Sequence, residues 1–97
     1  MTVRVEVELV GFLKKMVNEK KTLLKFDGSV RVNDVVSELT NRFPSSFKHA
    51  IIDPELNDPR PNVLILLDGV EISVLDGLET RVKNGARMVL IPISHGG

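Results

Sequence analysis

The sequence predicts a two-layer α+β domain, in which one main helix packs on one face of a small mixed sheet. Residues 2–9 alternate polar and apolar side chains with the period of a strand, and residues 32–43 place apolar side chains at helical spacing. Further strand-like runs follow a long irregular segment. Because a helix with one apolar stripe must bury it against another element, the helix and the sheet are expected to share one core.

Composition supports a single globular domain. The chain has 97 residues, which suffice for one hydrophobic core. Its longest uninterrupted apolar run, residues 63–67, is far shorter than the roughly 20 residues of a membrane-spanning helix. The absence of cysteine excludes disulfides, thiolate metal sites and cysteine catalysis. Since no secretory signal opens the chain, we expect a cytoplasmic protein with no membrane partner.

The charge balance argues against direct binding of nucleic acid. Thirteen basic residues match thirteen acidic residues, whereas proteins that bind the phosphate backbone usually carry a basic excess. Phenylalanine is the only aromatic residue, so stacking platforms for single strands are not expected either.

The first two strands are expected to form an antiparallel hairpin with a long connection. Residues 2–9, TVRVEVEL, have one face directed inward (Val3, Val5, Val7, Leu9) and one toward solvent (Thr2, Arg4, Glu6, Glu8). Residues 12–17 predict one helical turn within the connection. The second strand, TLLKF at residues 22–26, ends at the Asp27-Gly28 turn signal.

The main helix is predicted over residues 32–43. Its apolar stripe consists of Val32, Val35, Val36, Leu39 and Phe43. Asn33 is the expected N-cap and Pro44 ends the helix. Residues 44–61 then form a long loop with a short helix at residues 46–51.

Two more strands and a final strand complete the sheet. An Asp68-Gly69 turn within NVLILLDGVEIS predicts a hairpin, and further turns are expected at Asp76-Gly77 and Asn84-Gly85. The last run, MVLIPI, is the final strand, and Pro92 must lie near its end or on an unpaired side because proline has no N–H to donate.

Catalytic motifs are not found, so the chain is not expected to be an enzyme. His49 and His95 lack the spacing of a zinc site, and the glycines form neither a dinucleotide fingerprint nor a phosphate loop. Asp53, Glu55 and Asp58 are spaced like part of a carboxylate cluster, but a solvated loop explains them better, and we expect no metal site. The serines lack the context of a nucleophile elbow.

The chain ends on Ser94-His95-Gly96-Gly97, directly after its most strand-like run. We therefore divide it into a domain of residues 1–93 and a flexible tail of residues 94–97. Either this tail is idle, or its carboxylate is the working group. Glycine suits a stalk that enters a narrow enzyme channel, because it has no Cβ and its φ is unrestricted. A carboxylate delivered in this way can attack the α-phosphate of ATP and form an acyl-adenylate.

The order of elements and the tail resemble the ubiquitin-like β-grasp proteins of the sulfur-carrier and modifier branch. This branch includes the small subunit of molybdopterin synthase, the thiamine sulfur carrier, and the ubiquitin-related modifier with its archaeal small-modifier relatives. The resemblance covers most of the chain and is most specific over RPNVLILLDGVEI and GLETRVKNGARMVLIPISHGG. Two positions depart from the family pattern. Ala86 replaces the usual acidic residue after the last turn, and Arg31 replaces the Ser or Thr that commonly precedes the helix.

The resemblance implies that Gly97 is activated by a ubiquitin-activating-type adenylyltransferase that uses ATP, while the chain itself binds no cofactor. A sulfurtransferase would then form a thiocarboxylate. The sulfur would go to molybdopterin, with the large subunit of molybdopterin synthase as partner, or to a tRNA base through a thiolation enzyme. Alternatively, the carboxyl would be joined to lysines of target proteins. Gly96 would supply clearance, and His95 and Ser94 would line the enzyme's channel; the alternative for His95 and Ser94 is a solvated tail. The remaining alternative is an interaction domain with an inert tail.

Contacts of the folded body with a partner are expected on the outer face of the sheet. Met88 and Leu90 have the opposite parity from Val89, Ile91 and Ile93. If Met88 and Leu90 are exposed, they suit a partner groove next to the tail. If they are buried, they belong to the core.

Overall fold

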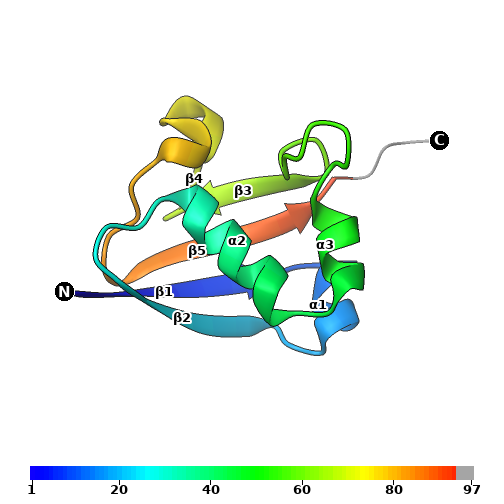
Figure 1. Ribbon diagram of the computed structural model, residues 1–97, viewed down its shortest axis with the longest axis horizontal. Helices are drawn as coiled ribbons and strands as arrows, with labels where there is room; N and C mark the ends of the chain where they lie inside the picture. The colour runs from blue at the N-terminus through cyan, green and yellow to red at the C-terminus, as the bar shows by residue number, and fades with distance from the viewer. Residues whose placement is uncertain (94–97) are drawn as a thin grey trace.

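The computed structural model describes residues 1–93 and shows the β-grasp architecture (Figure 1). Five strands form one mixed sheet in the order β2-β1-β5-β3-β4. The helices cover one face of this sheet and leave the other face open. The predicted class, a two-layer α+β domain with one main helix on a small mixed sheet, is confirmed.

The first hairpin forms as the alternation predicts. Strand β1 (Thr2–Leu9) pairs antiparallel with β2 (Lys21–Asp27), and the short helix α1 (Phe12–Val17) lies in the connection. Every second residue of β1, starting with Val3, is buried, and the residues between them are exposed or half-buried. Thr22 and Leu24 are buried on the inner face of β2.

The main helix α2 (Val32–Arg42) begins two residues earlier than an N-cap at Asn33 would place it. The prediction of Asn33 as N-cap is wrong, because Arg31 occupies that position with extended backbone angles. The Asp34 carboxylate accepts the backbone N–H of Arg31 at 2.8 Å, so the first turn is held from within the helix. At the other end the N–H of Phe43 donates to the Leu39 carbonyl, and Pro44 follows.

The second half of the chain supplies the central strand. Helix α3 (Ser45–Ile51) leads to β3 (Val63–Leu67) and the two-residue β4 (Val70–Glu71). Two 3₁₀ turns, η1 (Ile72–Val74) and η2 (Gly77–Glu79), precede β5 (Ala86–Pro92). Strand β5 pairs parallel with β1 and antiparallel with β3, which places the last strand of the described chain in the middle of the sheet.

One core lies between the sheet and the helices. It contains the inward residues of β1, β3 and β5, the stripe of α2, and single residues from the short elements such as Leu13, Phe47 and Ile72. Within residues 1–93 no helix has the length and apolar character needed to cross a membrane.

Candidate functional site

The candidate site is the end of β5, from which the chain continues toward Ser94. Because β5 is central, hydrogen bonds hold its end on both sides: the N–H of Val10 donates to the Leu90 carbonyl at 3.2 Å, and the N–H of Ile93 donates to the Asn62 carbonyl at 2.9 Å. The body thus fixes the point at which residue 94 follows. The four predicted site residues Ser94, His95, Gly96 and Gly97 lie outside the described residues.

Pro92 is accommodated by Gly11. The backbone carbonyl of Leu90 points toward β1, since it accepts the N–H of Val10. The backbone of Pro92, two residues later, points in the same direction. The missing N–H of Pro92 therefore points beyond the end of β1, and the ladder to β3 stays complete, as the sequence predicts for a proline near a strand end. Gly11 has φ 64° and ψ −138°, and a Cβ at this position would lie 3.3 Å from the Pro92 Cγ.

We expect Gly11→Ala to lower the free energy of unfolding by about 1–3 kcal/mol, since these backbone angles are open to glycine almost alone and the new methyl group meets the proline ring. Chemical denaturation measures this loss. Gly28→Ala is the matched control, because Gly28 also has a positive φ but no atom within 4 Å of the added Cβ. An equal loss in the two variants would contradict a specific contact between Gly11 and Pro92.

Met88 and Leu90 do not form a partner-contact face. Both are fully buried, and the register pairs Met88 with Val7 and Leu90 with Leu9 on the inward side of β1. The interpretation of these residues as exposed is wrong, and their burial in the core is what the structure shows. The reason is the central position of β5: a strand flanked on both sides and covered by helices packs its inward residues completely.

The exposed apolar surface of the sheet comes instead from the alternate residues of β5 and β3, whose side chains lie on the open face. Val89 and Ile91 of β5 lie beside Leu66 and Leu64 of β3, and all four are half-buried on the open face. Ile93, 40 % exposed, continues this row toward residue 94. We call these five residues the outer apolar patch. The same face is charged over β1, where Glu6 accepts from Arg87 at 3.1 Å and lies 3.7 Å from the Lys21 amine.

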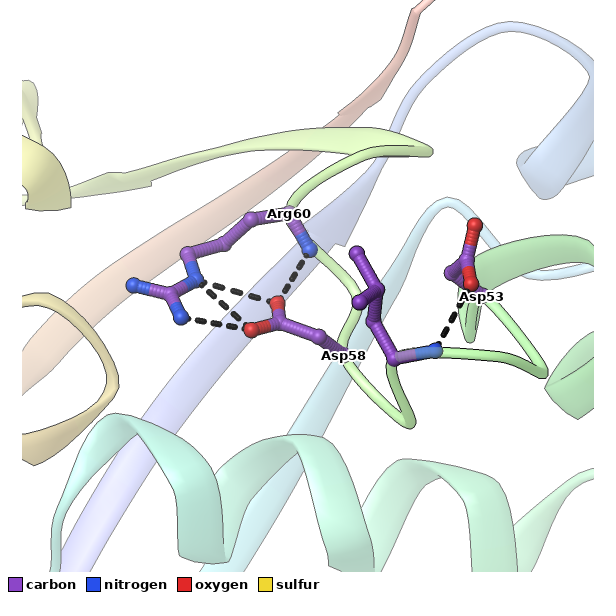
Figure 2. A network of polar contacts seen from close by, with 4 residues as sticks. Asp53, Asp58 and Arg60 are labelled. Carbon is purple, nitrogen blue, oxygen red and sulfur yellow. Dashed lines mark hydrogen bonds and ion pairs between the residues drawn. The ribbon is translucent and has the colours of Figure 1, made fainter.

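The loop before β3 forms a turn held by a network of polar contacts (Figure 2). The Asp53 carboxylate accepts the backbone N–H groups of Glu55 and Leu56 at 2.9 Å, and Asp53 and Asp58 form an isolated bridge. The Asp58 carboxylate faces the Arg60 guanidinium, with a shortest distance of 2.5 Å. These hydrogen bonds from Arg60 are the main cause that lowers the pKa of Asp58.

The same turn shows what its carboxylates do. Asp53 and Asp58 hold the turn, while Glu55 is exposed. Among the residues that the structure describes, no group of three or more histidine or acidic side chains is placed to bind a metal ion. His49 is exposed on α3.

Comparison with known proteins finds a matching family and a protein of similar sequence. Residues 4–97 match the family described as Urm1 (Ubiquitin related modifier). The chain is 26 % identical to small archaeal modifier protein 3 of Haloferax volcanii over 92 aligned residues. The aligned region covers 95 % of this chain and 97 % of that protein.

Solved structures agree with this match. The solution structure of small archaeal modifier protein 1 from Methanosarcina acetivorans is 25 % identical, with a TM-score of 0.81 over 100 % of this chain and 99 % of that one. The solution structure of Urm1 from Trypanosoma brucei, 21 % identical, has a TM-score of 0.75 and covers 99 % of this chain and 97 % of that one.

Proposed function

Because this chain belongs to the Urm1 (ubiquitin related modifier) family, and is thus a non-catalytic carrier or modifier, we propose that it works through the carboxylate of Gly97. An E1-like enzyme binds the protein and ATP. A carboxylate oxygen attacks the α-phosphate, an acyl-adenylate forms, and pyrophosphate leaves. A lysine amine that attacks the activated carbonyl displaces AMP and gives an isopeptide bond. The terminal sulfur of a sulfurtransferase persulfide that attacks the same carbonyl displaces AMP and gives an acyl disulfide, and a thiol then cleaves the S–S bond to release the thiocarboxylate and a new disulfide.

The position of β5 carries this proposal. The central strand β5, held by β1 and β3, ends at Pro92, five residues before Gly97, so the body provides a fixed base for a short segment that contains two glycines. Glycine offers no side chain to obstruct an enzyme channel. The family match supports the proposal further, since it extends through residue 97 and includes both glycines.

The outer apolar patch is the surface that we assign to the activating enzyme. It lies on the open face of the sheet and runs along β5 toward residue 94, so an enzyme that holds the patch also receives the segment that follows. A sulfurtransferase acts next where sulfur is the cargo. Transfer to molybdopterin, to a tRNA base, or to lysines of target proteins are the alternative end points, and all three share the activated Gly97 in the cytoplasm.

The test uses the absence of cysteine. A thiocarboxylate at Gly97 is then the strongly thiol-like nucleophile of the chain, and iodoacetamide alkylates it at neutral pH. We expect protein purified from its own cells to show one alkyl adduct, which a peptide map places on Gly97. The same map, searched for Gly97 joined to foreign lysines, detects the modifier product. If neither product occurs and the E1-like enzyme forms no adenylate, the inert-tail alternative holds.

A further inference from the structure

The balanced net charge of the chain conceals two oppositely charged surfaces beside the end of β5. Residues 12–21, the basic flank, contain four lysines and one acidic residue, Glu19. Residues 53–58, the acidic flank, contain three acidic residues and no basic one. Figure 1 shows α1 and the loop after α3 at the end of the sheet where β5 stops.

The two flanks lie on opposite sides of β5. The basic flank follows β1, and Gly11, the residue directly before this flank, lies against Pro92. The acidic flank precedes β3, and the carbonyl of Asn62, the residue directly before that strand, accepts the N–H of Ile93. Since β1 and β3 are the two neighbours of β5 in the sheet, the chain leaves the body between a positive and a negative surface.

The charges of the basic flank are available for a partner. Glu19 accepts the Thr22 hydroxyl at 2.6 Å, and Lys21 faces Glu6. Lys14, Lys15 and Lys20 are exposed, and among residues 1–93 the structure records no ion pair for them. Interspersed with these lysines are the exposed side chains of Phe12 (52 %) and Met16 (40 %), one helical turn apart.

The acidic flank presents its groups on a stiff frame. The bonds of Asp53 and the Asp58–Arg60 pair fix the turn, and Leu56 at its tip is 68 % exposed. Glu55, beside Leu56, makes no side-chain ion pair among the described residues. Unpaired exposed charge is therefore positive in the basic flank (Lys14, Lys15, Lys20) and negative in the acidic flank (Glu55). Each flank also carries exposed apolar side chains and is held by local structure, which lowers the entropy cost of docking.

We propose that these flanks orient the chain on the E1-like enzyme of the proposed function, whose channel mouth carries acidic groups facing α1 and basic groups facing the turn at residues 53–58. Two contacts of opposite sign exclude the docking that is rotated by half a turn about β5, because both pairs would then repel. The patch on the sheet supplies apolar area, and the flanks set the direction from which Gly97 enters. The mixture of lysine with Phe12, Met16 and Leu56 favours a protein partner over a phosphate-bearing one.

ATP–pyrophosphate exchange with the E1-like enzyme of the same organism tests this inference on the full chain. For Lys14→Glu/Lys15→Glu we expect KM for the carrier to rise about 10-fold with kcat within about 2-fold, since charges outside the reacting centre act on encounter and binding. The wild-type KM should rise with salt, and the variant should lose most of this dependence. Arg81→Glu/Lys83→Glu is the matched control, because these exposed residues lie beside the start of β5, at the other end of the sheet.

Glu55→Lys distinguishes an enzyme mouth that carries both acidic and basic groups from a mouth that is acidic throughout. Two flanks predict a higher KM for this variant as well, whereas an enzyme that attracts positive charge everywhere would give a lower KM and overturn the inference. Unchanged KM in Lys14→Glu/Lys15→Glu, with wild-type adenylation intact, would overturn the inference and leave the proposed function standing. Failure of the wild-type chain to be adenylated would overturn both.

Discussion

Deletion of Gly97 alone should reduce ATP-dependent activation by at least about 100-fold. Removal of one residue withdraws the terminal carboxylate by about 3.3–3.6 Å along an extended chain. Misplacement of a reacting group by only 1 Å can cost about 100-fold, because the attack requires near-contact with the phosphorus and alignment with the leaving group. β5 cannot slide forward within the body to compensate, since hydrogen bonds hold it on the β1 side up to Leu90 and on the β3 side up to Ile93.

Pyrophosphate exchange at saturating ATP measures this effect. Ser94→Ala is the matched control, because it changes the same segment without shortening it, and it should keep activation within a few-fold of the wild type. Both variants should have the melting temperature of the wild-type chain, since the changes lie outside the described core within residues 1–93. Activation of the shortened chain at the wild-type rate would show that Gly97 is not the reacting residue.

Much of the fold was predictable because several elements carry unambiguous patterns. The alternation of β1 fixes its buried face, and the stripe from Val32 to Leu39 fixes that of α2. The N-cap was not predictable from residue 31 alone. Arg31 has no side chain that caps, and the Asp34 carboxylate performs this role from the first turn.

The face of β5 could not be predicted from its own residues. Its last six residues are almost all apolar, so their alternation distinguishes two faces without saying which is inside. The register with β1 decides the matter, since it aligns Met88 with Val7, whose burial the first strand makes clear. Only the parallel pairing of two strands about 80 residues apart in the sequence supplies this information. The position of the flanks at residues 12–21 and 53–58 on either side of β5 likewise follows only from the strand order.

Leu90→Asp should unfold the protein, whereas Ile91→Asp should leave it folded. Leu90 is fully buried, and a carboxylate there finds no partner in a core of apolar side chains. We expect a loss of about 4–5 kcal/mol or more, a large part of the roughly 5–15 kcal/mol that stabilises a small domain. Ile91, one residue later, lies half-buried on the open face, and its replacement should cost about 1 kcal/mol.

The two substitutions separate stability from binding within a single strand. Thermal or urea unfolding should place Ile91→Asp near the wild type, and exchange assays with the E1-like enzyme should then show a KM raised about 10-fold, because a charge now lies within the outer apolar patch. Leu90→Asp should show no cooperative transition at all. Similar unfolding curves for the two variants would contradict the assignment of the faces of β5. Unaltered KM in folded Ile91→Asp would remove the patch from the enzyme contact while leaving the activation of Gly97 untouched.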